Sequence, residues 1–321
     1  MVKAGIIGAA GYTGGELIRI LLRHPGVDID FCYSRSQNGK PVFDVHTDLS
    51  GDTDLFFTNE IKPGADVLFL CLPHGEARLF LEKHNISTGT KIIDLSNDFR
   101  LKDHPSDFVY GLPELNKTAI KKATKIANPG CFATAIQLAL LPLANKCLLN
   151  SAIHISGITG STGAGVSLSE TTHFTWRNDN ISVYKAFTHQ HLSEIKQSLC
   201  QLQDSFHHPI HFIPYRGDFT LGIFTTIYTD FDGTLENATN LYQTFYKDEP
   251  FTILSAKSID LKQVVNTNKC LLYLEKHEDK LMIVSIIDNL IKGASGQAVQ
   301  NMNLLFGIEE TEGLKLKPAA Y

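Results

Sequence analysis

Hydrophobic and polar positions alternate with two different periods in the first third of the chain. Apolar runs of strand length occur at residues 2–8, 27–34, 65–73 and 90–96, and helical patterns occupy residues 14–25 and 76–85. The first helical pattern repeats its leucines and isoleucines every 3.6 residues. Strands joined through helices form a parallel sheet with right-handed crossovers. The pattern therefore predicts a doubly wound α/β domain of the Rossmann type.

After about residue 131 the pattern changes to alternating, hairpin-like strands. These strands are expected at residues 151–160, 208–217, 219–231, 269–277 and 280–290, with helices at 191–203, 235–248 and 293–307. Alternation of this kind is typical of antiparallel sheets with one solvated face. We predict an α+β domain with a mostly antiparallel sheet and place the domain boundary near residues 128–131.

Composition narrows the function classes. The 321 residues, 43% of them hydrophobic, suffice for two domains with cores of their own. A net charge of -5 without a basic run gives nucleic acid or an anionic membrane little to bind, so neither partner is expected. There is neither a secretory signal pattern nor an apolar run of membrane-spanning length, and a cytoplasmic location is expected.

The cysteines and histidines give no metal signature. Six scattered cysteines form no C-x-x-C pair, and the histidine clusters at 189–191 and 207–211 lack a cysteine or carboxylate at ligand spacing. We predict free thiols and no metal. Five of the cysteines lie within or beside apolar runs and are interpreted as packing residues: Cys32, Cys71, Cys147, Cys200 and Cys270.

A glycine-rich turn joins the first predicted strand to the first predicted helix. It has the spacing G-x-x-G-x-x-G, with residues Gly8, Ala10, Gly11, Tyr12, Thr13 and Gly14 as candidate cofactor contacts. Glycines let the backbone approach a pyrophosphate, and the helix N-terminus supplies unpaired N–H groups. The alternative is an ordinary glycine-rich turn, but the flanking strand and helix favour dinucleotide binding.

Two further loops lie where the cofactor is expected. The second strand ends at Ser34 and Arg35 instead of the acidic residue that binds the ribose of NAD, which favours NADP. The alternative is that Arg35 is an ordinary solvent-exposed charge on this loop and does not contact a cofactor. His74 follows another predicted strand, where it is either a cofactor contact or simply a loop residue.

Cys131 lies between Asn-Pro-Gly and an apolar, helix-forming run. A thiol at a helix N-terminus feels the positive end of the helix dipole, which favours its thiolate. A thiolate that attacks an activated acyl group gives a thioester, which accepts a hydride. The alternative for Cys131 is a packing role.

An acid/base candidate occurs further along the chain. His189 and His191 are followed by Glu194, which shares a helix face with His191 and is placed to orient its ring. The competing interpretation is a surface histidine pair with a helix-capping glutamate. Arg216 ends a predicted strand, where it either clamps a substrate carboxylate or phosphate or forms a structural salt bridge.

In combination these segments resemble the N-acetyl-γ-glutamyl-phosphate reductases, an arginine-pathway family of the aspartate-semialdehyde-dehydrogenase-like group. The resemblance covers nearly the whole chain and rests on residues 8–14, 94–100, 110–114, 128–131, 189–194, 216–217 and 292–301.

The resemblance implies an NADP-binding Rossmann domain formed by residues 1–130 with 293–321, and a catalytic and oligomerisation domain formed by residues 131–292. It implies a homodimer or homotetramer that acts on a small-molecule substrate. Cys131 matches the nucleophile and His191 the acid/base, with His189 second for that role. The other residues implied at the site are Gly296 for the cofactor and Arg100, Asn128, Ser161 and Arg216 for the substrate.

The chain departs from the family pattern at two places. The usual H-R-H is His189-Gln190-His191, and the basic residue expected after Ala164-Gly165 is Val166. Because this second segment is expected near the substrate, the acyl group on the substrate nitrogen stays open between acetyl and succinyl. The resemblance implies NADPH-dependent reduction of the acyl phosphate to the semialdehyde. The alternatives are an aspartate-semialdehyde-type or lysine-pathway reductase, and a nucleotide-binding sensor without catalysis.

Overall fold

The computed structural model describes residues 1–102 and 106–319. It separates the chain into two compact units, each described by itself. The first unit comprises Met1–Gly130 and Ala294–Lys315, and the second comprises Cys131–Gly293 with the described residues from Leu316 onward.

The first unit contains a seven-stranded sheet in which every pairing is parallel. Its strand order is β3-β2-β1-β4-β5-β7-β6, the doubly wound order that the sequence pattern predicts. The strands are β1 (Val2–Ile7), β2 (Val27–Tyr33), β3 (Phe57–Thr58), β4 (Val67–Leu70), β5 (Lys91–Asp94), β6 (Val109–Tyr110) and β7 (Lys125–Ala127). The helices are α1 (Tyr12–Leu21), α2 (Glu76–Lys83), α3 (Pro113–Ile120) and α8 (Gly296–Phe306).

The apolar runs of this unit form strands because helices cover the sheet. All four residues of β4 are buried, as are the last four of β1. A strand covered on both faces needs a continuous apolar sequence, and this is the pattern of residues 65–73. Single turns of 3-10 helix at Val42–Asp44 and Thr47–Leu49 follow β2.

The second unit contains a mixed sheet of seven strands in the order β12-β13-β14-β11-β8-β10-β9. Four of its six pairings are antiparallel, which confirms the mostly antiparallel sheet. The strands are β8 (Ile153–Thr159), β9 (Ser182–Val183), β10 (Ile210–Arg216), β11 (Ile223–Asp230), β12 (Thr252–Leu254), β13 (Cys270–His277) and β14 (Lys280–Ile287). The helices are α4 (Cys131–Asn145), α5 (Phe174–Arg177), α6 (His191–Leu202) and α7 (Leu235–Phe245), with 3-10 turns at Ser161–Ala164, Glu170–Thr172 and Leu261–Gln263.

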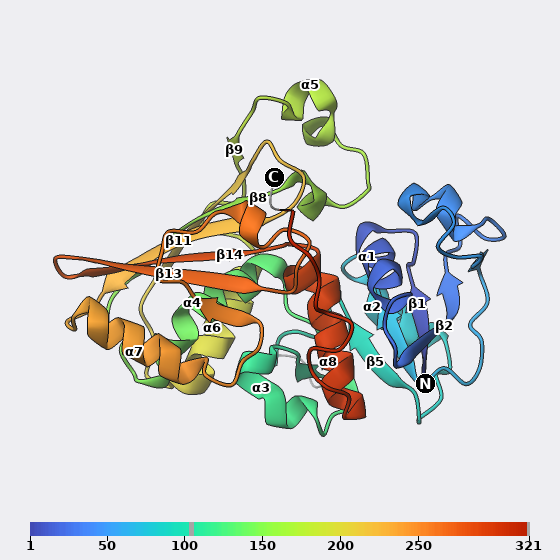
Figure 1. Cartoon of the computed structure of the whole chain (residues 1–321), viewed down its shortest axis with the longest axis horizontal. Helices are drawn as coiled ribbons and strands as arrows, with labels where there is room; N and C mark the ends of the chain where they lie inside the picture. The colour runs from blue at the N-terminus through green and yellow to red at the C-terminus, as the bar shows by residue number, and fades with distance from the viewer. Residues whose placement is uncertain (103–105, 320–321) are drawn as a thin grey trace. The chain divides into compact units, whose positions relative to one another are not determined.

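Helix α4 forms the core of this second unit. It packs against β11, β13 and β14 of the sheet and against α6 and α7, and residues 132–144 are all buried (Figure 1). A helix that is apolar on every side is stable only when protein surrounds it completely. Because the helix begins at Cys131, this packing fixes the start of the helix in the second unit.

The segment between β8 and α6 departs from this compact arrangement. It forms a long excursion that carries α5 and the short strand β9, shown at the top of Figure 1. Its side chains include exposed apolar groups, among them Leu168 and Phe174. The sequence pattern predicts none of the elements in this excursion.

Candidate active site

Cys131 is the first residue of α4 and is partly exposed. A Cβ atom added to Gly293 would lie 2.7 Å from the Cβ of Cys131, so only glycine allows the two segments this close. Gly157 on β8 is similarly required, because a Cβ there would lie 2.6 Å from the Phe132 ring. The fifteen-residue helix directs its positive dipole end toward the thiol.

His189 lies in an aromatic pocket beside this helix start. Its ring makes edge contacts with Phe132, Tyr184 and Phe212 at centroid distances of 5.7, 5.7 and 5.5 Å. Burial, reinforced by the charge of Lys185, lowers the pKa of His189 to about 4. Its Nδ1 accepts the backbone N–H of His191 at 3.3 Å, which assigns the proton of the neutral ring to Nε2.

His191 and Glu194 occupy the first turn of α6 and share one face. The distance from His191 Nε2 to Glu194 Oε1 is 3.8 Å, and both side chains are buried. The rings of His189 and His191 are 4.6 Å apart. The structure thus brings together the three acid/base candidates predicted from the H-x-H-x-x-E spacing.

Tyr184 connects this cluster to the thiol and to Arg216. The pKa of its phenol is raised, first by burial and then by the charge of Cys131, so the phenol stays protonated. The Arg216 guanidinium carbon lies 4.6 Å from the centre of the Tyr184 ring, and its Nη1 donates to Thr171 Oγ1 at 3.1 Å. Sequence reasoning missed Tyr184. Its only signal is its place five residues before His189.

Ser161 is the substrate contact that the family resemblance implies on the segment after β8. It begins a 3-10 turn directly after β8, and its backbone N–H donates to Phe219 O at 2.8 Å. The substrate role of Ser161 stays a prediction.

In the first unit, the glycine-rich turn has the compact form that nucleotide binding needs. Gly8 has a φ of +81°, and a Cβ there would lie 2.3 Å from Cys71 O. A Cβ on Gly14 would lie 2.6 Å from Ala9 Cα, and Gly11 caps α1. The turn therefore leaves the first N–H groups of α1 at an open helix end.

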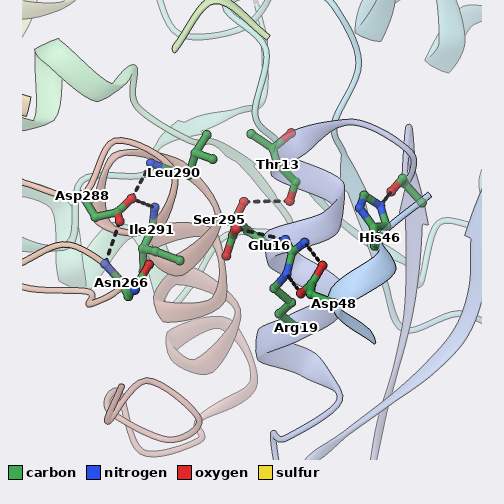
Figure 2. A network of polar contacts seen from close by, with 11 residues as sticks. Thr13, Glu16, Arg19, His46, Asp48, Asn266, Asp288, Leu290, Ile291 and Ser295 are labelled. Atoms are coloured by element: carbon green, nitrogen blue, oxygen red, sulfur yellow. Dashed lines mark hydrogen bonds and ion pairs between the residues drawn. The ribbon is translucent and has the colours of Figure 1, made fainter. Parts of the chain in front are cut away.

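His46 contacts this glycine-rich turn and the first residues of α1. It was not among the residues predicted from the sequence. Its Nε2–H donates to Ala9 O at 2.8 Å, and its ring occupies the space that a Cβ on Gly15 would need (Figure 2). Burial lowers the pKa of His46, which keeps the ring neutral. Ser295 Oγ, at the start of α8, donates to Thr13 O at 2.8 Å on the same turn.

The other predicted cofactor contacts lie on loops of the same unit. Ser34 is buried, with its Oγ 3.5 Å from Ser36 Oγ. Arg35 has a side chain that is 74% exposed, with one guanidinium nitrogen 3.8 Å from the Glu76 carboxylate. His74 Nδ1 accepts the backbone N–H of Asn97 at 3.1 Å, which ties together the loops after β4 and β5.

Comparisons with known proteins agree with both units. Residues 3–123 match the family model described as "Semialdehyde dehydrogenase, NAD binding domain", and residues 131–289 match "Semialdehyde dehydrogenase, dimerisation domain". The N-acetyl-gamma-glutamyl-phosphate reductase of Christiangramia forsetii is 60% identical over 317 residues, covering 99% of each chain. The corresponding reductase of Flavobacterium johnsoniae is also 60% identical, over the whole of both chains. The chain belongs to the N-acetyl-γ-glutamyl-phosphate reductase family.

Solved structures similar to this reductase family member extend the likeness in fold. Aspartate semialdehyde dehydrogenase II of Vibrio cholerae, complexed with ASA, has a TM-score of 0.74 at 16% identity and covers 96% of this chain and 98% of its own. The enzyme of Candida albicans with NADP has a TM-score of 0.71 at 17% identity, covering 95% and 99%. At these identities the likeness shows the fold alone.

The remaining residues that the family resemblance implies lie inside the first unit. Arg100 is buried and donates to the carbonyls of Asn128 and Leu95, each at 2.8 Å. Asn128 is fully buried and donates to Ala294 O at 3.0 Å. Gly296 begins α8, which a π-helical turn at Ile291–Ser295 precedes. Their substrate and cofactor roles stay predictions.

The cysteines outside the site are mostly inert, with one correction. Burial raises the pKa of the Cys32 and Cys71 thiols to about 12. Cys147, in contrast, is exposed, so its interpretation as a packing residue is wrong. It follows the end of α4 with a φ of +54°, where the chain turns outward. Within residues 1–102 and 106–319, no group of three or more His, Cys, Asp or Glu side chains is placed to hold a metal, and no helix has the length and apolarity to span a membrane.

Proposed function

We propose that the protein reduces N-acetyl-γ-glutamyl phosphate to N-acetylglutamate 5-semialdehyde with NADPH, releasing phosphate, as a step of arginine biosynthesis. The names of its relatives at about 60% identity support this substrate. The observation that carries the chemistry is the cluster at the start of α4. There Cys131 shares its surroundings with Tyr184 and the His189–His191 pair.

The thiolate of Cys131 acts as the nucleophile. It attacks the acyl carbon of the substrate, the C–O bond to the phosphoryl group breaks, and phosphate leaves, which forms a thioester. After hydride addition the carbon carries an oxyanion, which takes a proton. When the C–S bond breaks, the hydroxyl proton is removed again and the aldehyde is released as the thiolate re-forms.

His191 is the better candidate for moving this proton. A group that protonates the oxyanion must carry an acidic proton near neutral pH, and His189, with a pKa of about 4, is a neutral ring there. His191 has the Glu194 carboxylate 3.8 Å from its Nε2, where the carboxylate is placed to orient the ring. His189 instead holds the backbone of His191 through its Nδ1.

The first unit fits a dinucleotide. The close approach of Gly8 and Gly14 to neighbouring backbone leaves no room for a side chain at these two positions, and the open N-terminus of α1 suits a pyrophosphate. Arg35 is exposed at the end of β2, where the 2′-phosphate of NADP is expected. A nicotinamide held there would supply the hydride for the thioester.

We further propose that the protein works as a homodimer or homotetramer in the cytoplasm. Support for the assembly comes from residues 131–289, which match the family model described as a dimerisation domain. The free cysteines accord with a reducing compartment.

The test is the Cys131→Ser variant, assayed as phosphate-dependent reduction of NADP by N-acetylglutamate 5-semialdehyde. We expect turnover to fall at least about 10³-fold because the hydroxyl is a far weaker nucleophile, while NADPH binding is kept. Cys147→Ser is the matched control, since that thiol is exposed and lies at the other end of α4. Normal turnover in Cys131→Ser would rule out the proposed chemistry. Preference for aspartate semialdehyde would rule out the substrate.

A further inference from the structure

Arg177, the last residue of α5, is a buried arginine that sequence reasoning did not select. Its residue exposure is 9%, and its Nη2 donates to Thr171 O at 2.9 Å. Its Nε and Nη1 are buried and have no hydrogen-bond partner among the residues that the structure describes. A guanidinium is always charged, and burying its donors without acceptors costs free energy. The side chain is therefore arranged to meet an anion.

A second arginine is anchored to the same residue. Arg216 donates to Thr171 Oγ1 at 3.1 Å, so both guanidinium groups bind Thr171. Burial and the charge of Arg216 lower the pKa of Arg177, and Asp218 offsets only part of this. One oxygen of Asp218 accepts the backbone N–H of Asp179 at 2.8 Å. Two like charges held together in this way favour an anionic ligand that neutralises both.

This arginine pair is continuous with the candidate active site. Arg216 stacks on the Tyr184 ring at 4.6 Å, and Tyr184 responds to the charge of Cys131. From the thiol outward, the order of interactions is Cys131, Tyr184 through its charge, Arg216 through the Tyr184 ring, and then, through Thr171, Arg177. Three residues, Tyr184, Arg216 and Thr171, thus stand between Arg177 and the reacting sulfur in this order.

The separation indicates which anion Arg177 meets. The phosphate group is attached through its bridging oxygen to the carbon that the thiol attacks, so phosphate lies beside Cys131. A carboxylate of the substrate lies further along the molecule and remains in the semialdehyde product. Its two oxygens match the paired N–H donors of a guanidinium.

We propose that Arg177, together with Arg216, binds a carboxylate of the substrate and sets which N-acylglutamyl compounds are accepted. The proposal rests on the proposed function. Two carboxylates have this chemistry: the α-carboxylate of the glutamyl group, and a carboxylate at the end of the N-acyl group, as in an N-succinyl substrate. Arg177 also supplies a basic residue in the segment where Val166 replaces the one that the family pattern carries.

The experiment measures KM and kcat for Arg177→Gln and Arg177→Lys in the NADP- and phosphate-dependent oxidation of three semialdehydes. These are N-acetylglutamate 5-semialdehyde, its α-carboxamide, and the N-succinyl compound. We expect Arg177→Gln to raise KM for the recognised carboxylate about 10- to 100-fold with a smaller effect on kcat. Arg177→Lys should raise KM less than Arg177→Gln does, because lysine keeps the positive charge but lacks the paired N–H donors of the guanidinium.

The three semialdehydes distinguish the two sources. If the acyl carboxylate is bound, Arg177→Gln raises KM for the N-succinyl compound and lowers the preference for it over the N-acetyl compound. If the α-carboxylate is bound, KM rises for both, and the variant no longer discriminates between the N-acetyl compound and its α-carboxamide. Either result supports the proposal. The matched control is Arg23→Gln, because that side chain is 81% exposed in the other unit.

Other results overturn it. If Arg177→Gln leaves KM unchanged for all three semialdehydes, Arg177 does not bind a substrate carboxylate. If only the KM for phosphate rises, Arg177 binds the leaving group instead. If both Arg177 variants have a lower melting temperature and lose activity equally with all three semialdehydes, Arg177 has a structural role. In these cases activity of the wild type with the N-acetyl or N-succinyl semialdehyde leaves the proposed reaction intact, whereas wild-type inactivity with both rejects the reaction itself.

Discussion

His189 and His191 have the same side chain but different surroundings, and the difference divides their roles. His189 is enclosed by aromatic rings, which makes its charged form costly and lowers its pKa to about 4. His191 instead faces the buried carboxylate of Glu194, 3.8 Å from its Nε2. Two residues apart in sequence, one histidine is suited to hold the backbone and the other to exchange a proton.

The buried neutral ring of His189 predicts a pH dependence of stability. Its pKa is about 4 in the folded protein and about 6.5 in the unfolded chain. As pH falls from 6.5 toward 4 the unfolded chain binds the proton first, so the free energy of unfolding decreases through this window. We expect His189→Gln to flatten this decrease in urea unfolding measured between pH 7 and pH 4.5.

His207→Gln is the control for this measurement because His207 is exposed. It should keep the wild-type slope. A His189→Gln variant whose stability falls as steeply as that of the wild type would contradict the assignment of a buried neutral ring.

At this scale the sequence predicted the placement of those candidate residues that are brought together by local spacing. Cys131 at a helix start and the H-x-H-x-x-E segment are examples, since a helix of known period fixes which side chains share a face. Tyr184 and Arg177 were missed because each acquires its role from residues distant in sequence, Cys131 and Arg216. No local pattern contains that information.

Helix α4 holds Cys131, the proposed nucleophile, at its first residue, and the position of this thiol depends on a glycine outside the helix. Gly293 approaches Cys131 so closely that Gly293→Ala must displace one of them, since the new Cβ would lie 2.7 Å from the Cβ of Cys131. We expect kcat to fall about 10- to 100-fold, as displacements of about 1 Å do in other enzymes. Gly89→Ala is the control, because its nearest side-chain atom is 3.9 Å away and its φ is not positive. Equal kcat values for the two variants would show that the thiol position tolerates the shift.

The proline inside α4 is compensated by side chains from other elements. Pro142 has no N–H to donate to Leu138 O, four residues earlier, and the Tyr246 hydroxyl donates to that carbonyl instead. Ser285 and Tyr242 donate in the same way to Ala135 O and Ala139 O. The interior of the helix thus keeps its carbonyls satisfied in an apolar environment.

This arrangement predicts a coupling between positions 142 and 246. Tyr246→Phe should lower the free energy of unfolding by about 1–3 kcal/mol, because the buried Leu138 carbonyl loses its donor. In a Pro142→Ala background the new N–H replaces the hydroxyl, so the same substitution should cost less than about 1 kcal/mol. A double-mutant cycle by urea unfolding measures this difference. Additive losses would show that the hydroxyl does not substitute for the missing N–H.

Elements with a sustained hydrophobic period were predicted, and very short ones were not. Strands β3, β6 and β9 have two residues each and exist because a neighbouring strand pairs with them. Two residues carry no period, so the pattern could not indicate them. Helix α3 contains a residue with non-helical backbone angles, Asn116, which interrupts its pattern.

On the scale of the whole molecule, the first unit is assembled from two separate segments of chain. Helix α8 is buried along residues 296–305 and packs on α1, α3 and β5. Asn301 donates to Gly111 O at 2.8 Å and to Asn128 Oδ1 at 3.0 Å, and Ser295 donates to Thr13 O. The periodicity of residues 293–307 predicts a helix but does not identify the elements that it packs against. An apolar face shows that a helix is buried, and the same pattern results whichever surface covers it.

The two-segment construction predicts that residues 1–130 do not form a stable unit alone. Without α8, the apolar surface that it covers would be exposed, and the carbonyls of Thr13 and Gly111 would lose their donors. We expect the isolated 1–130 fragment to lack a cooperative unfolding transition and to bind NADPH weakly. Joining the fragment to residues 294–315 through a glycine-serine linker should restore cooperative unfolding and NADPH binding. A short linker suffices because the ends of the two segments lie close together: Asn128 Nδ2 is 3.0 Å from Ala294 O. Circular dichroism during thermal unfolding and NADPH fluorescence titration measure the two properties. Equal NADPH affinity of the fragment with and without residues 294–315 would show that the turn at residues 8–14 is held by the first segment alone.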